Sequence, residues 1–113
     1  MKMIWQILLT PIAALMLSSV HAECAIPEVV VVPDGETAAE EEMIAGQKQV
    51  KQYMANMQAY LDCIDAESTA IGEEQTDEQR AAHVQMYNAG VDAMESVAAQ
   101  FNAEVRAYKA SNN

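Results

Sequence analysis

The stretch that decides the fold is residues 84–108, VQMYNAGVDAMESVAAQFNAEVRAY. Apolar or small residues recur in it at steps of three and four, the spacing that places them along one side of an α-helix. The preceding Thr76-Asp77-Glu78-Gln79 has the form of a capping box, a typical helix start. Gly90 lies off the apolar row, so we interpret it as a tolerated weak point rather than a helix end. We expect one long helix that packs through Val84, Tyr87, Val91, Met94, Ala98, Phe101, Val105 and Tyr108.

A second helix is expected upstream, over about residues 38–67. Thr37-Ala38-Ala39-Glu40 has the form of another capping box, and residues 40–42 are glutamates, which the helix dipole favours in a first turn. Gly72 and its polar neighbours would form the connection. Two long helices with an apolar repeat of about 3.5 residues predict an all-α fold, an antiparallel two-helix hairpin with coiled-coil-like packing. The upstream row is Met43, Gln47, Val50, Met54, Met57, Leu61 and Ile64.

Residues 23–36, ECAIPEVVVVPDGE, favour an extended conformation. The four consecutive valines are β-branched, and Pro27 and Pro33 exclude a continuous helix. Thirteen extended residues reach about 43 Å, which matches the roughly 37 Å rise of a helix from Ala38 to Cys63. We therefore expect the segment to fold back along the first helix and a disulfide to join Cys24 to Cys63. An intermolecular disulfide is the alternative. The valines would cover Ile44, Tyr53 and Tyr60.

Residues 1–22 predict a cleaved secretory signal peptide. Lys2 precedes an almost wholly apolar stretch from Ile4 to Leu17, and Val20 and Ala22 give the small residues that signal peptidase requires. The remaining chain would comprise the segment 23–36, a hairpin domain over 37–110 and a frayed tail over 111–113. A periplasmic location is expected, and secretion from the cell is the alternative. An even cysteine count in an oxidising compartment agrees with one disulfide.

The charge of the chain after residue 22 limits the kinds of partner that we expect it to bind. Seventeen acidic residues against five basic ones give a net charge of −12. Such a surface repels nucleic-acid phosphates and anionic lipids, so we expect no nucleic-acid partner and no stable membrane insertion after cleavage. A protein partner in the cell envelope, or a second copy in a homodimer, is expected instead.

No catalytic, metal-binding or cofactor-binding motif is present in the sequence. His83 lacks a second histidine or a cysteine at ligand spacing, and the carboxylate clusters lack the pattern of a calcium loop. Four of the five methionines after residue 22 fall on the helix rows, and Met86 is the exception, which makes it a candidate for a partner contact. Tyr53 and Tyr60 share one flank of the first helix; we expect them to pack under the valines, with partner contact as the alternative.

Two longer stretches carry a resemblance, PDGETAAEEEMIAGQKQVKQYMANMQAYLDCID (33–65) and YNAGVDAMESVAAQFNAEVRAYKA (87–110). They resemble small exported proteins of Gram-negative bacteria to which no activity is assigned. The resemblance implies periplasmic residence and a helical fold, and it supplies no catalytic residues.

Three classes of function agree with these observations. The first is a non-enzymatic periplasmic helical module that self-associates, as a four-helix bundle, or docks on an envelope protein. The second is an acid- or redox-responsive chaperone-like stress protein. The third is a metal-handling protein that uses methionine, His83 and carboxylates. An enzyme is not expected, because no catalytic constellation is present.

Overall fold

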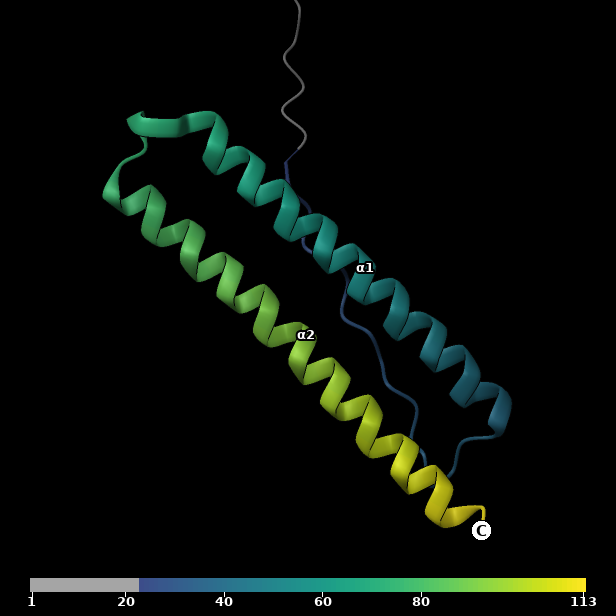
Figure 1. Cartoon of the computed structure of the whole chain (residues 1–113). Helices are drawn as coiled ribbons and strands as arrows, with labels where there is room; N and C mark the ends of the chain where they lie inside the picture. Colours follow the sequence, from purple (N-terminus) through teal and green to yellow (C-terminus); the bar gives the residue numbers. More distant parts are fainter. Residues whose placement is uncertain (1–22) are drawn as a thin grey trace, which may run out of the picture.

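The computed structural model describes residues 23–113, so the signal peptide expected over residues 1–22 lies outside the described residues. Two long helices, α1 (Glu40–Ile71) and α2 (Asp77–Ser111), pack side by side and run in opposite directions (Figure 1). A short 3-10 helix, η1 (Gly72–Glu74), joins them at one end. Residues 23–113 contain no β-strand. The expected all-α helical hairpin is therefore confirmed.

The two helix starts differ in their capping. Thr76 is the N-cap of α2: its hydroxyl accepts a hydrogen bond from the Gln79 N–H at 3.1 Å, and the Gln79 side chain accepts one from the Thr76 N–H at 2.8 Å. This capping box is confirmed. The box expected at Thr37 is wrong, because the N-cap of α1 is Ala39 and no side chain caps it. Instead the N–H groups of Thr37 and Ala38 donate to the Asp34 carbonyl and extend the preceding turn.

The helices also extend further than expected at their C-terminal ends. Helix α1 continues four residues past Glu67 to Ile71, and its C-cap is Gly72, whose φ of 62° lies in the left-handed region that glycine tolerates. The Gln75 side-chain amide donates to the Ser68 hydroxyl at 3.0 Å and links the connection to the last turn of α1. Helix α2 includes Ser111, so the expected tail shortens to two residues.

The core lies along the side of α1 that faces both α2 and the extended segment. Leu61 is 1 % exposed and Met57 is 2 % exposed, and Val97 of α2 packs against this cluster. We expected Gly90 to be only a tolerated weak point of the helix, and this expectation is wrong. Gly90 is buried where the two helices meet. A Cβ atom at Gly90 would lie 2.8 Å from Cδ2 of Leu61. The absence of a side chain therefore permits the close approach of α2 to α1. The buried apolar residues are Met43, Val50, Tyr53, Met57, Tyr60, Leu61, Ile64 and Val97.

The extended segment runs along the groove between the helices (Figure 1). Cys24 and Cys63 form an intramolecular disulfide with their Cα atoms 5.6 Å apart, so the expected pairing is present and the intermolecular alternative is not. At the other end the Pro33 ring packs on Gly46, and the Gly35 N–H donates to a Glu104 carboxylate oxygen at 2.6 Å. A side chain at Gly35 would overlap the backbone of Glu104. The segment thus bridges both helices and is attached at both ends.

Candidate functional site

The hairpin has two sides, the segment face and the opposite face. The segment face is the side covered by residues 24–33. The opposite face is turned away from that segment and includes a groove to which both helices contribute, lined by Glu40, Met43, Ile44, Gln47, Phe101, Val105 and Tyr108. Ile44 is 47 % exposed there, so the expectation that the valines cover it is wrong. Ile44 lies on the other flank of α1 from Tyr53 and Tyr60.

An apolar cavity of about 260 Å³ lies on the segment face and brings together all three residues considered as partner contacts. Tyr53 and Tyr60 are 6 % and 7 % exposed, so packing under the segment is their role in the folded chain. Met86 is 42 % exposed at the α2 side of the cavity. Tyr53 also lines the groove between the segment and α1, and Tyr60 lines the one beside the disulfide. Its lining is Ile26, Pro27, Val29, Tyr53, Met57, Tyr60, Met86, Ala89, Gly90 and Ala93.

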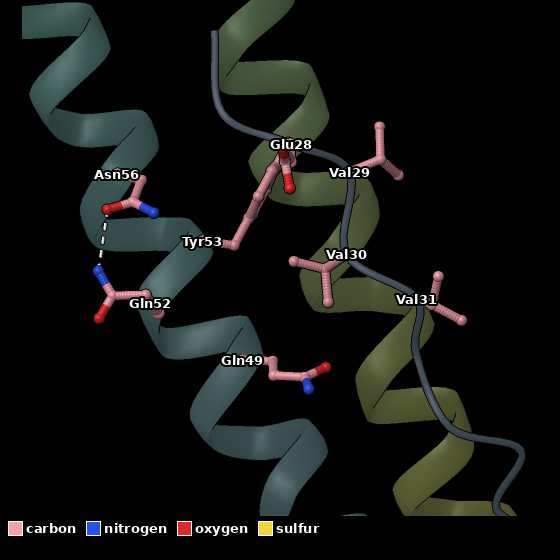
Figure 2. A pocket seen from close by; sticks show the side chains of 8 residues that line it. All are labelled: Glu28, Val29, Val30, Val31, Gln49, Gln52, Tyr53 and Asn56. Carbon is pink, nitrogen blue, oxygen red and sulfur yellow. Dashed lines mark hydrogen bonds between the residues drawn. The ribbon is translucent and has the colours of Figure 1, made fainter. Parts of the chain in front are cut away.

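The side chains of the valine run alternate between inward and outward directions. Val30 packs against the core cluster, whereas Val29 and Val31 are 86 % and 84 % exposed. Figure 2 shows the side chains of Val29 and Val31 turned away from α1 and that of Val30 turned toward it. Ile26 is 72 % exposed and extends the outward row. This exposed apolar row was not singled out from the sequence, although the two-residue period of an extended chain could have indicated it.

A second groove, of about 500 Å³, lies between the segment and α1 (Figure 2). Glu28 and the valines form one side, and Gln49, Gln52 and Asn56 line the other. The amides of Gln52 and Asn56 bond each other at 2.9 Å. No hydrogen bond from a backbone or side-chain group joins residues 23–33 to the rest of the described chain. Side-chain packing and the disulfide, rather than hydrogen bonds, therefore hold residues 23–33 on the helices.

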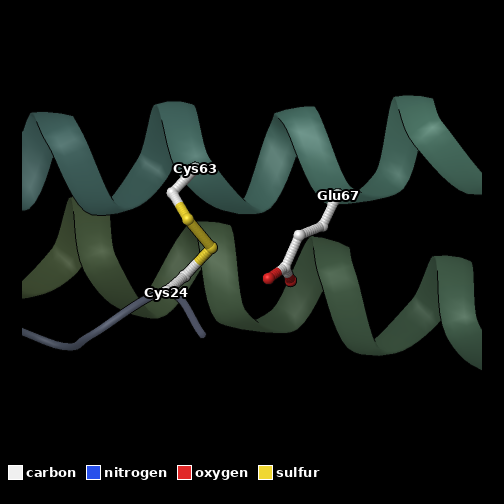
Figure 3. A group of neighbouring side chains, drawn as sticks. All are labelled: Cys24, Cys63 and Glu67. Carbon is white, nitrogen blue, oxygen red and sulfur yellow. A yellow bond between two sulfur atoms is a disulfide. The ribbon is translucent and has the colours of Figure 1, made fainter. Parts of the chain in front are cut away.

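The Glu67 carboxylate lies beside the disulfide. Figure 3 shows the Glu67 carboxylate turned toward the sulfur atoms, and its oxygen and the two Sγ atoms lie within 4.8 Å of one another. Three such groups could hold a metal ion if the cysteines were thiolates. Because the two sulfur atoms bond each other, only the carboxylate remains as a possible metal ligand. We therefore interpret the arrangement as a disulfide with a neighbouring carboxylate.

His83 contacts α1 through Asp65. The His83 Nε2 and Asp65 Oδ1 atoms lie 2.8 Å apart, and the imidazole ring neighbours Tyr87. This contact joins the two helices near the connection and forms an ion pair when the histidine is protonated. The three-residue cluster at the disulfide, described above, does not include His83.

The packing row of α2 is only half covered, and its uncovered part lies on the opposite face. None of its eight residues from Val84 to Tyr108 is buried, whereas Met43, Val50, Met57, Leu61 and Ile64 of the α1 row are buried. Tyr87, Val91, Met94 and Phe101 pack against the core cluster with one side, whereas Phe101, Val105 and Tyr108 also line the groove of the opposite face. Val84, Val91, Ala98 and Val105 follow one another at steps of seven and therefore share one line on this face. Val84 is 53 % exposed.

Comparison of the chain with known proteins identifies no relative. No protein-family model matches the chain, and no significant match is found among curated proteins or solved structures. The resemblance to small exported proteins stays a prediction. Within residues 23–113, no helix is long and apolar enough to cross a membrane.

Proposed function

We propose that the protein is a non-enzymatic, exported helical module that acts by self-association, with two copies packed through their opposite faces into a four-helix bundle. The observation that carries this proposal is the half-covered packing row of α2. A row at steps of three and four along a long helix is typical of helix–helix packing. A second hairpin would cover it, as in four-helix bundles. A periplasmic location is part of the proposal and is supported by the composition of residues 1–22.

The distribution of charge favours an antiparallel arrangement of the two copies. Four of the five basic residues in 23–113 lie toward the end where α1 begins and α2 finishes: Lys48, Lys51, Arg106 and Lys109. The acidic residues of that end are Asp34, Glu36, Glu40, Glu41, Glu42 and Glu104, so it is the less acidic of the two ends. The end with the connection holds Asp62, Asp65, Glu67, Glu73, Glu74, Asp77 and Glu78, with Arg80 as its basic residue. Parallel copies would bring two acidic ends together. Antiparallel copies place the more acidic end of each copy beside the less acidic end of the other, which holds four of the five basic residues.

The test is the mass of the chain over residues 23–113 in solution, measured by light scattering after size-exclusion chromatography at about 100 µM. We expect twice the monomer mass in both oxidising and reducing buffer. Val84→Glu and Ile44→Glu place charges on the opposite face at exposed positions, so each should give a folded monomer. Val31→Glu is the matched control on the segment face and should leave the dimer intact.

Two results would contradict self-association through this face. One is a monomeric wild-type chain at that concentration. The other is a dimer that Val31→Glu dissociates and Val84→Glu does not.

A further inference from the structure

We propose that the apolar cavity of about 260 Å³ on the segment face binds a small uncharged aromatic molecule of two fused rings that carries one hydrogen-bonding group. This segment-face cavity lies on the other side of the hairpin from the proposed dimer contact, so the two proposals are independent. Three features support the binding site: two buried tyrosines whose hydroxyl groups have no partner, an uncharged lining, and a buried floor beneath an exposed rim.

Tyr53 and Tyr60 are buried without a hydrogen bond for their hydroxyl groups. Both residues are more than nine-tenths buried, and no hydrogen bond within residues 23–113 involves either hydroxyl. A phenolic hydroxyl can donate and accept, and a buried tyrosine usually finds a partner for it. Within the same residues, no side-chain oxygen or nitrogen atom is fully covered without a partner, so these hydroxyl groups open onto unfilled space. The segment-face cavity is the space that both tyrosines line.

The lining of the cavity selects an uncharged ligand. It contains no charged residue, although the chain after residue 22 carries a net charge of −12. An ammonium or carboxylate group placed in the cavity would lose its hydration without gaining an ion-pair partner, which is costly. The acidic surface would in addition repel an anion. A neutral molecule with one polar group can place its rings among the apolar side chains and bond a tyrosine hydroxyl through that group.

The cavity has a buried floor and an exposed rim. Met57 is buried and forms the floor with the two tyrosine rings. Ile26 and Val29 of the segment and Met86 of α2 are exposed and form the rim. A ligand would enter past this rim and cover the inner sides of its side chains, which removes apolar surface from water. The rim thus gives the exposed apolar side chains of the segment a role.

Small residues of α2 give the cavity its width. Ala89, Gly90 and Ala93 line that side, where helical positions three and four apart share one face. An apolar cavity of about 150 Å³ holds benzene, so about 260 Å³ leaves room for two fused rings. The thioether and tyrosine groups of the lining make favourable contacts with aromatic rings. These contacts favour a flat aromatic ligand over a flexible aliphatic chain, which also loses more conformational entropy on binding.

The segment wall of the cavity is in place before a ligand binds. Cys24, two residues before Ile26, is bonded to Cys63. At the other end of the segment, the Pro33 ring packs on Gly46. A wall that is attached at both ends needs little ordering when the ligand enters, so less of the interaction free energy is lost.

The experiment titrates the isotopically labelled chain over residues 23–113 with 2-naphthol at neutral pH, where this ligand is uncharged, and follows binding by NMR. We expect a dissociation constant below about 1 mM and shifts of the methyl signals of Met57, Met86 and Ala93. Two ligands of similar size serve as controls: 2-naphthoate is charged and 1-octanol is aliphatic. Both should bind about tenfold more weakly, because the first is desolvated without a partner and the second is flexible.

Three variants locate the site. Ala89→Leu fills the cavity from its exposed rim, so it should weaken 2-naphthol binding about tenfold while the chain stays folded. Ala99→Leu adds the same side chain at an exposed position of α2 that lines neither this cavity nor the groove of the opposite face, and should leave binding unchanged. The double variant Tyr53→Phe/Tyr60→Phe keeps both rings and removes both hydroxyl groups. It should weaken 2-naphthol binding about fivefold and leave binding of naphthalene, which has no hydroxyl group, unchanged.

The proposal is overturned if 2-naphthol does not bind at millimolar concentration, or if the shifts map to the opposite face. Equal affinity of the wild type and Ala89→Leu would also overturn it, as would equal affinity for 2-naphthol and either control ligand. A double phenylalanine variant that binds 2-naphthol as the wild type does would contradict the assigned hydrogen bond. None of these results bears on the dimer mass, so a failure here is distinguishable from a failure of self-association.

Discussion

Gly90 shows how one residue controls the distance between the helices. Glycine in the middle of a helix costs about 1 kcal/mol relative to alanine, and Gly90 lies within the 35 residues of α2. In the folded chain it lies against Leu61 and Met57. The intrinsic cost is offset because the helix backbones can approach closely and pack these side chains.

Larger residues at position 90 should therefore destabilise the hairpin. Gly90→Val adds branched volume against Leu61, and we expect a loss of about 1–3 kcal/mol in the free energy of unfolding. Gly90→Ala should be nearly neutral, because the gain in helix propensity opposes a shift of the Leu61 side chain. Urea denaturation followed by circular dichroism measures both. Ala99→Val, at an exposed position of α2, controls for the lower helix propensity of valine. A stabilising Gly90→Val would contradict the close contact.

At the scale of the helices, the two starts resemble each other in sequence and differ in structure. Both Thr37 and Thr76 precede a glutamate or glutamine by three residues. Only Thr76 forms the reciprocal bonds. At Thr37 the Asp34 carbonyl accepts from two N–H groups and the Asp34 side chain accepts from the Glu36 N–H. The Pro33-Asp34-Gly35 turn therefore directs the chain into α1 without a threonine cap.

Alanine substitutions should separate these two threonines. Thr76→Ala removes a side-chain acceptor from a helix N-terminus, so we expect it to lower the free energy of unfolding by about 1 kcal/mol. Thr37→Ala should change it by less than about 0.5 kcal/mol, as is usual for an exposed position. Thermal and urea unfolding of the two variants side by side provide the measurement. Equal losses would indicate that Thr37 also caps α1.

At the scale of the whole molecule, the extended segment completes the core that two helices begin. Tyr53 and Tyr60 are buried beside it, and one covalent bond holds its first residues. The disulfide closes a loop with a sequence separation of 39 residues. A small domain depends strongly on such a link, because its core alone buries little apolar surface.

Replacement of both cysteines by serine should show how far the molecule depends on this bond. Chain-entropy arguments for a loop of this length give a loss of about 4 kcal/mol in the free energy of unfolding. We also expect faster hydrogen exchange at residues 24–30 than at Gly35, which keeps its bond to Glu104. Calorimetry and NMR hydrogen exchange measure the two effects. A double variant with wild-type stability would show that packing alone holds the segment.

Most of the local structure could be predicted from the sequence, because the apolar rows of the helices, a capping box and the length of a segment depend on residues that are close together in the chain. The periods of three and four predicted both helices, and the match of two lengths predicted the Cys24–Cys63 bond. Three residues of the segment-face cavity were singled out from the sequence, but not the cavity that joins them. No local pattern relates Met86 of α2 to Tyr53 and Tyr60 of α1. The false capping box at Thr37 followed from a pattern that is local but depends on the turn before it.

Residue periodicity and chain length were thus sufficient for the hairpin, its antiparallel direction and the path of the segment. The rotation of each helix about its own axis was decided by tertiary packing. That rotation turns the apolar side of α1 toward the segment, leaves the row of α2 half covered and buries Gly90. Side-chain spacing says which residues share a helix face, but only contact with the other helix and the disulfide-held segment decides which face is covered. The exposed row of Ile26, Val29 and Val31 has the same origin, because the alternation is local and its direction is set by the groove beneath it.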